Sequence, residues 1–188
     1  LVDRADREGE ADLFFPAALA TPALVNFLIR EGCGLVCAPM TAEHALRLEL
    51  PLMVAPELNE EAHRCSFTVS IDARRGVGSG ISAADRATTL GRLAEPDAAA
   101  SDFVRPGHVF PLVAAGGGLQ ERDGHTEAAI ALCELAALPP IGVLCELINP
   151  DGTMARGNAV TAFAHRHGLP VITVAAIAAA TTAPARPA

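Results

Sequence analysis

Short apolar runs alternate with capped helical segments along the 188 residues of this chain. The runs are as long as single buried strands, whereas the segments between them are long enough for helices. This interleaving predicts a mixed α and β domain in which helices pack on a sheet. The expected strands lie at 11–17, 34–40, 66–72, 108–113, 141–148 and 169–174, and the expected helices lie at 22–31, 41–48, 82–94, 124–137 and 158–167.

Local capping signals place several of these boundaries. Thr21 followed by Pro22 is typical of a helix start, with threonine as N-cap and proline in the first turn. Ser82 with Asp85 three residues later resembles a capping box, and Gly168 is expected to close the segment 158–167.

Two segments give predictions that depend only on the local pattern. In 66–72, Phe67, Val69 and Ile71 are expected to face one way, with the polar residues between them facing the other. The tripeptide 105–107, Arg-Pro-Gly, is expected to form a turn that leads into the strand 108–113.

The composition of the chain argues against two classes of binding partner, nucleic acid and membrane. The formal net charge of −8 argues against nucleic acid as a general partner, because phosphate backbones bind Lys/Arg-rich surfaces. The longest apolar run, 171–180, is about half of the roughly 20 residues that span a bilayer, so no membrane partner is expected. Five cysteines without a C-x-x-C pair indicate buried thiols and a reducing, cytoplasmic location.

Acidic side chains alternate in the segment 6–12, at Asp6, Glu8, Glu10 and Asp12. On a regular strand they would all face one way and repel one another. The segment is therefore either a solvated loop, which the pattern alone favours, or the oxygen-rich site of a hard cation such as Mg²⁺ or Mn²⁺.

Two further residues are candidates for acid–base chemistry. Glu146 lies in an apolar strand, where a carboxylate is unfavourable unless it is paired, protonated or able to reach water. We slightly favour a general acid or base over a solvated strand end. His108 follows the Arg-Pro-Gly tripeptide, and it suits a catalytic base and a hydrogen-bonded structural residue equally well.

Anion binding is possible at two places. Arg122, His125 and Thr126 surround a helix start, where free amides attract phosphate, although an ordinary cap by Asp123 is the commoner arrangement. His125 could be a metal ligand or a general base, although a lone histidine at a helix start is more often a polar surface residue. The glycine-rich segment 76–80 either approaches a phosphate through its amides or is a flexible turn.

Five ordered segments together resemble the 3,4-dihydroxy-2-butanone 4-phosphate synthase family, over residues 2 to about 177. These segments are 6–13, 80–89, 105–112, 124–128 and 145–156. The resemblance implies a three-layer α+β fold around a mixed sheet and a homodimer with sites near the subunit interface. It also implies the conversion of D-ribulose 5-phosphate to formate and L-3,4-dihydroxybutan-2-one 4-phosphate.

The resemblance further assigns roles to individual residues. Glu8 and His125 would hold two divalent ions, Mg²⁺ or Mn²⁺, and His108 and Glu146 would be the acid–base pair. The residues that would contact the sugar phosphate are Arg7, Glu8, Asp12, Arg122 and Thr126.

The chain departs from the family pattern at Gly9, Ala11 and the Gly78-Ser79 pair. Ala11 would be strained if its position required a positive φ. The alternative function is therefore a catalytically weak or inactive relative that serves as a binding or assembly module. A third possibility is a phosphosugar isomerase that uses the same enediol chemistry.

The resemblance also bears on the domain limits. We expect one domain over 1–178, which lacks an N-terminal helix and part of its first strand. The Thr/Pro/Ala-rich residues 179–188 are expected to form a disordered tail.

Overall fold

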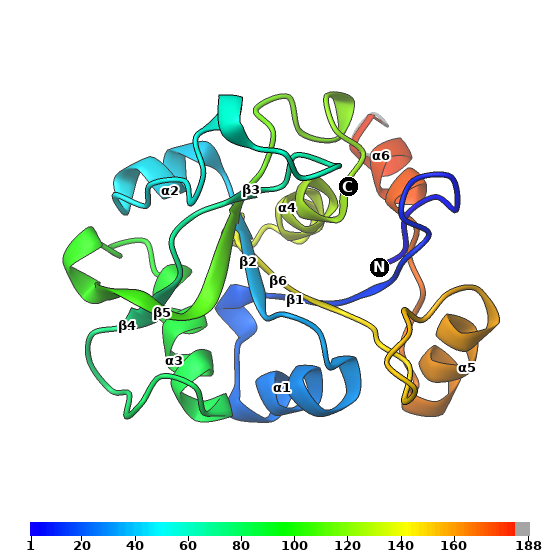
Figure 1. The fold of residues 1–188 in the computed structure, drawn as a ribbon, viewed down its shortest axis with the longest axis horizontal. Coiled ribbons are helices and arrows are strands. Elements are labelled where there is room, and N and C mark those ends of the chain that lie inside the picture. Colours follow the sequence, from blue (N-terminus) through cyan, green and yellow to red (C-terminus); the bar gives the residue numbers. More distant parts are fainter. Residues whose placement is uncertain (183–188) are drawn as a thin grey trace.

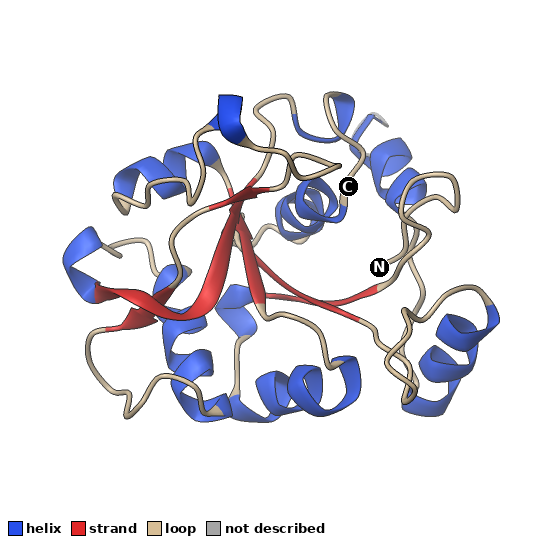
Figure 2. Cartoon of the chain, viewed as in Figure 1, coloured by secondary structure: helices blue, strands red, loops and turns tan. Residues whose placement is uncertain are grey.

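The computed structural model describes residues 1–182 and contains one mixed sheet with helices on both faces (Figures 1 and 2). The sheet order is β1-β6-β2-β5-β3, and β4 pairs with the first half of β5. The strands are β1 (Asp12–Pro16), β2 (Cys37–Met40), β3 (Ser66–Phe67), β4 (Ile71–Ala73), β5 (Phe103–Val113) and β6 (Gly142–Glu146). The helices are α1 (Pro22–Phe27), α2 (Ala42–Arg47), α3 (Ala83–Leu93), α4 (His125–Leu135), α5 (Asn158–His167) and α6 (Val174–Thr182).

Helix α4, with α6 packed against it, covers one face of the sheet, and α1 and α3 cover the other (Figure 1). On the α4 side, Leu112 and Leu144 of the sheet pack with Ala129. The larger core between the sheet and helices α1 and α3 contains Val25 and Leu90. The prediction of a three-layer α+β domain is confirmed, because each sheet face buries its apolar side chains under helices.

Strand register brings distant residues to the same end of the sheet. β1 and β6 are antiparallel, and Asp12 lies directly opposite Glu146. Cys37 of β2 pairs with Phe110 of β5 in parallel and with Leu144 of β6 in antiparallel orientation. Because directly opposite residues point to one face, the side chains of Asp12 and Glu146 both face the α4 side.

The predicted caps are confirmed. The Thr21 hydroxyl accepts a hydrogen bond from the Leu24 amide at 3.2 Å, and the Ser82 hydroxyl accepts one from the Asp85 amide at 3.0 Å. Helix α5 has the predicted limits, and Gly168 follows it with φ of 63°. Helix α1, in contrast, continues into a wider π-helical turn over Leu28–Gly32 instead of simply stopping at glycine.

The prediction of one alternating strand over 66–72 is wrong. Its first part, β3, pairs with the end of β5, and its last part, β4, pairs nearer the start of β5. Between them Thr68 is fully buried, and its hydroxyl donates to the Val69 carbonyl at 3.0 Å. The polar side chains of this segment were expected to face solvent, but Thr68 and Ser70 are buried and their hydroxyl groups make hydrogen bonds within the protein.

The turn expected at 105–107 is also absent. Strand β5 runs without a break from Phe103 to Val113, through a cis peptide bond between Arg105 and Pro106. Gly107 lies against the backbone of Ile71, where any side chain would collide with it. This close approach explains why glycine follows proline here without reversing the chain.

The last expected strand, 169–174, is wrong as well. In this segment Thr173 forms one isolated bridge with Val2, and α6 then begins at Val174. The alanines that follow Val174 favour helix, and α6 packs on α4. Residues 179–182, expected to be disordered, belong to α6, and 183–188 lie outside the described residues. No helix within residues 1–182 combines the length and apolar character needed to cross a membrane.

Candidate functional site

The acidic segment forms a folded loop organised by Asp3. The buried Asp3 carboxylate accepts hydrogen bonds from the amides of Glu8 and Glu10 at 3.1 and 2.9 Å, and from Arg7 Nη1 at 3.0 Å. Gly9 has φ of +64°, which suits glycine, whereas Ala11 pairs with Val2 and has no positive φ. The strain considered for Ala11 is therefore not present.

Part of the negative charge of this loop is neutralised from within the chain. Arg7 Nη1 lies 2.6 Å from Glu8 Oε1, and the Arg7 side chain is only 10% exposed. The same Glu8 oxygen lies 3.7 Å from His63 Nε2. The segment is therefore not a simply solvated loop. The guanidinium group of Arg7 provides part of the neutralisation that water or a metal ion would otherwise provide.

Asp12 and His125 meet at the buried end of the site. Asp12 Oδ2 lies 3.4 Å from His125 Nδ1, and both side chains are 8% exposed. Burial, followed by the nearby Glu146 carboxylate, raises the pKa of Asp12 well above its usual value. Burial also lowers the pKa of His125 to about 4, so its imidazole is neutral at pH 7.

His125 has one ring nitrogen without a partner. Its Nε2 atom is buried and makes no hydrogen bond within the described part of the chain. A neutral imidazole with a free, buried nitrogen suits a metal ligand, because a bound ion would satisfy that nitrogen. Among residues 1–182, however, no group of three or more His, Cys, Asp or Glu side chains could hold an ion by itself.

Glu146 is held by a backbone amide at the end of β6. Its Oε2 atom accepts a hydrogen bond from the Leu35 amide at 2.7 Å. Gly34 permits this contact, because a methyl group there would lie 2.6 Å from the Glu146 nitrogen and would collide with its carboxylate. No site role was expected for Gly34 or Leu35 from the sequence, and the one available signal was a glycine at the start of a strand, which can mark a close approach of the backbone.

Asp123 does not cap the start of α4, although an ordinary cap by this residue was the commoner expectation. Gly124 is the N-cap and has no side chain, whereas Asp123 Oδ2 lies 2.6 Å from Arg4 Nη1. Arg122 Nε donates to Glu127 Oε2 at 3.0 Å, and Glu127 Oε1 accepts from the Ala115 amide at 2.8 Å. The buried Glu127, which sequence reasoning missed, therefore orients Arg122.

Two arginines from distant segments converge at Gly124. A methyl group added there would lie 3.1 Å from Arg7 Nη2 and 3.4 Å from Arg122 Nε. Thr126 follows in the first turn of α4 and is 4% exposed. Two guanidinium groups beside a helix start form a suitable environment for an anion.

His108 lies on β5, across β2 from Glu146. Cys37 of β2 pairs with Phe110 on one side and with Leu144 on the other. His108 lies two residues before Phe110 on β5, and Glu146 lies two residues after Leu144 on β6. The alternation along both strands therefore places His108 and Glu146 at the same end and on the same face of the sheet.

The glycine-rich segment 76–80 is held by the side chain of Asp85. The Gly78 and Gly80 amides donate to the Asp85 carboxylate at 3.1 and 3.0 Å. The Asp85 side chain, expected within a capping box, thus holds this loop against α3. Two of its amides are therefore already bound within the chain, and the segment is not a freely flexible turn.

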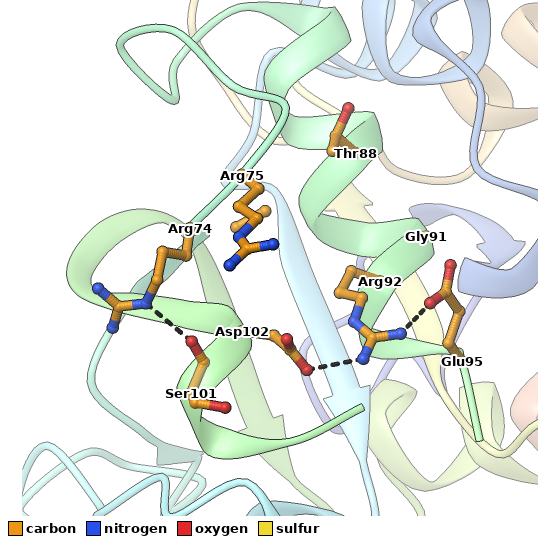
Figure 3. Close-up of a pocket in the computed structure, with 9 residues that line it drawn as sticks. Arg74, Arg75, Thr88, Gly91, Arg92, Glu95, Ser101 and Asp102 are labelled. Carbon is orange, nitrogen blue, oxygen red and sulfur yellow. Dashed lines mark hydrogen bonds and ion pairs between the residues drawn. The ribbon is translucent and has the colours of Figure 1, made fainter. Parts of the chain in front are cut away.

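A cavity of about 830 Å³ lies between β4 and α3 and contains none of the predicted site residues (Figure 3). Three arginines line it, but Arg92 pairs with Glu95 and Asp102, and Arg74 donates to the carbonyls of Ser101 and Phe103. We do not assign the anion site to this cavity, because it lies apart from the residues that meet at the start of α4.

The fold and the geometry define an α+β domain with a charge-rich candidate active site at one end of a mixed sheet. A family model described as 3,4-dihydroxy-2-butanone 4-phosphate synthase matches residues 1–180. The chain belongs to this family of enzymes, as the resemblance implied.

Individual relatives agree with this membership. The 3,4-dihydroxy-2-butanone 4-phosphate synthase of Chromobacterium violaceum is 51% identical over 178 residues, which cover 95% of this chain and 84% of the relative. The riboflavin biosynthesis protein RibBA of Salinispora arenicola is 51% identical over 179 residues, 95% of this chain but only 42% of that protein. This chain therefore spans less than half the length of the second relative.

A solved structure shows the same fold. The crystal structure of a 3,4-dihydroxy-2-butanone 4-phosphate synthase in complex with two magnesium ions has a TM-score of 0.90 and 42% sequence identity. The match covers 96% of this chain and 88% of that chain.

Proposed function

We propose that the protein converts D-ribulose 5-phosphate to L-3,4-dihydroxybutan-2-one 4-phosphate and formate. The observation that carries the proposal is the convergence of Asp12, His125 and Glu146 at one end of the sheet, beside the arginines at Gly124. The reaction needs an enediol from the ketose, loss of a hydroxyl group, a shift of the carbon skeleton and release of one carbon. Those steps require an anion anchor, proton carriers and stabilisation of negative charge.

Arg7 and Arg122 are the proposed phosphate anchor. Their guanidinium groups both lie close to Gly124, at the start of α4, where the helix dipole also favours negative charge. Thr126 would add a hydroxyl contact from the first turn. Anchoring the phosphate away from the reacting carbons lets its binding energy orient the sugar.

Glu8 and His125 are the proposed protein ligands for Mg²⁺ or Mn²⁺. The free, buried Nε2 of His125 and the partly exposed Glu8 carboxylate fit such an ion. Mg²⁺ is usually held by one or two protein groups, with water and substrate oxygens completing its shell, so a three-residue cluster is not required. When bound, the ion would stabilise the negative charge of the enediolate.

Glu146 and His108 are the proposed proton carriers. Glu146 keeps its carboxylate at the end of β6 through the Leu35 amide, partly exposed and beside the buried Asp12. His108 presents a half-buried imidazole at the same end of the sheet. The two groups can therefore take and return protons on the sugar carbons without large movements of the backbone.

The direct experiment supplies ribulose 5-phosphate with Mg²⁺ to the folded protein and measures formate. One formate released for each ribulose 5-phosphate consumed is the expected result. Consumption of the sugar without formate would indicate the isomerase instead. No reaction by the folded, metal-supplied protein would indicate the inactive relative and reject the proposal.

We also propose that the protein acts as a homodimer. Apolar side chains on and after α2 are exposed, including Leu46 at 80% and Leu58 at 68%, and Met53 and Val54 lie between them. Exposed apolar groups of this kind favour association with a second copy. Sedimentation of the purified protein should give a mass near twice 19.4 kDa, and Leu58→Asp should shift it toward the monomer.

A further inference from the structure

The imidazole of His108 is paired with a carboxylate that the family resemblance did not assign. Asp72 Oδ2 lies 2.7 Å from His108 Nδ1, and Asp72 Oδ1 accepts the His108 amide hydrogen at 2.9 Å. The Asp72 side chain is 7% exposed, whereas that of His108 is 40% exposed. One buried carboxylate therefore holds both the backbone and the ring of the histidine.

The surroundings leave the pair little freedom. A side chain on Gly80 would collide with the Asp72 carboxylate and would lie 2.7 Å from His108 Nδ1. Gly80 has φ of +91°, and its amide is bound to Asp85 at 3.0 Å. The glycine loop consequently closes over the Nδ1 side of the ring, and the Nε2 side remains the exposed one.

The strand beneath the pair is also fixed from β4. The Gly107 amide donates to the Ser70 hydroxyl at 3.1 Å, directly before the two bonds that His108 makes with Asp72. Arg86 of α3 lies within electrostatic range of the Asp72 carboxylate. An ionised carboxylate can only accept hydrogen bonds, so it selects the proton on Nδ1.

We propose that Asp72 is a positioning residue for His108: it fixes the tautomer with the proton on Nδ1, so that Nε2 is the atom presented for proton transfer. The orientation and tautomer of a catalytic imidazole are commonly set by the partner of its second nitrogen. The catalytic part of this inference rests on the proposed function, whereas the tautomer can be tested without it.

The test uses Asp72→Asn in the full chain, with Asp97→Asn as a matched control at an exposed aspartate. The asparagine amide can donate to Nδ1, which would move the ring proton to Nε2. Nitrogen NMR of the histidine side chains, with the His108 signals assigned from their loss in His108→Gln, reports the tautomer. The wild type and the control should show the proton on Nδ1, and Asp72→Asn should show it on Nε2.

Formate release gives the second measurement. Asp72→Asn should lower kcat at least tenfold and leave KM within about twofold, because the phosphate anchor is untouched. Gly80→Ala should lower kcat similarly by displacing the carboxylate, whereas Gly116→Ala, which meets nothing within 4 Å, should not. Circular dichroism would confirm that each variant is folded.

Three results would overturn the inference. The first is a wild-type ring with its proton on Nε2. The second is an Asp72→Asn protein that keeps the wild-type tautomer, and the third is a switched tautomer with unchanged kcat. If the wild type released no formate, the proposed function would fail, and the NMR measurement alone would still decide whether Asp72 sets the tautomer.

Discussion

The Asp12 carboxylate lies 3.4 Å from Nδ1 of His125 and joins the edge strand β1 to the start of α4. Both groups are buried, and burial moves their pKa values in the directions that favour their neutral forms. Burial therefore weakens the ionic character of this contact, because it disfavours the charged form of each partner. The contact with Asp12 keeps the uncharged imidazole of His125 beside the acidic loop, where it is able to bind a metal ion.

Asp12→Asn should stabilise the metal-free protein at neutral pH. The folded-state pKa of Asp12 is raised, so ionising it costs stability once the pH exceeds its unfolded pKa of about 4. The gain should be near zero below pH 4 and reach about 1–3 kcal/mol well above it. Thermal unfolding of both proteins between pH 4 and 8 measures this, and a gain that grows on acidification would contradict it.

His125→Asn should weaken binding of Mn²⁺ at least tenfold, because it removes the imidazole nitrogen that is free to bind a metal. Isothermal titration calorimetry with Mn²⁺ measures the affinity. His165→Asn, at an exposed position on α5, is the control and should bind as the wild type does. Equal affinity for Mn²⁺ in all three proteins would show that His125 is not a metal ligand.

Gly34→Ala should lower formate release about 100-fold, although the substitution adds a single methyl group. That methyl would occupy the space of the Glu146 carboxylate and break its bond to the Leu35 amide. Gly91→Ala is the matched control, since a methyl there meets nothing within 4 Å and stabilises helix α3 by up to about 1 kcal/mol. Similar activity of the two variants would show that the position of Glu146 is unimportant.

Arg122→Gln should raise the KM for ribulose 5-phosphate about 10- to 100-fold with a smaller effect on kcat. The glutamine can still donate to the buried Glu127, so the change removes mainly the positive charge offered to the phosphate. Steady-state kinetics checks this, with Arg166→Gln on α5 as the control. A fall in kcat at constant KM would instead assign Arg122 to the chemical step.

Ala11→Gly should not increase activity, because Ala11 has an ordinary φ and packs in a small core with Leu147. Gly9→Ala should destabilise the acidic loop by about 1–2 kcal/mol, since φ of +64° is strained for alanine. Formate assays and thermal unfolding of both variants measure these effects. Higher activity of Ala11→Gly would instead support the alternative that this protein is a catalytically weak member of the family.

Several features were determined by local sequence. The caps at Thr21 and Ser82 and the limits of α5 depend on interactions within a few residues, so the sequence alone predicted them. The strand positions of Asp12 and Glu146 followed from flanking apolar residues for the same reason.

Other features depend on contacts between distant segments. The split of 66–72, the continuous β5 and the helical 174–182 arise from pairing or packing partners that local patterns do not contain. The same holds for the supporting residues of the site, which sequence reasoning missed: Asp3, Gly34, Leu35, Asp72 and Glu127. Their roles are hydrogen bonds or close approaches across the fold, so no local propensity reveals them.

Residue type alone sets which chemical groups this protein carries: carboxylates, imidazoles and guanidinium groups can all be read from the amino-acid sequence. The tertiary structure decided which of them meet and in what state. Burial raises the pKa of Asp12 and lowers that of His125, and the partners of Arg7, Glu146 and His108 set their orientation. Both effects come from desolvation and hydrogen bonding between segments that only the folded chain brings together.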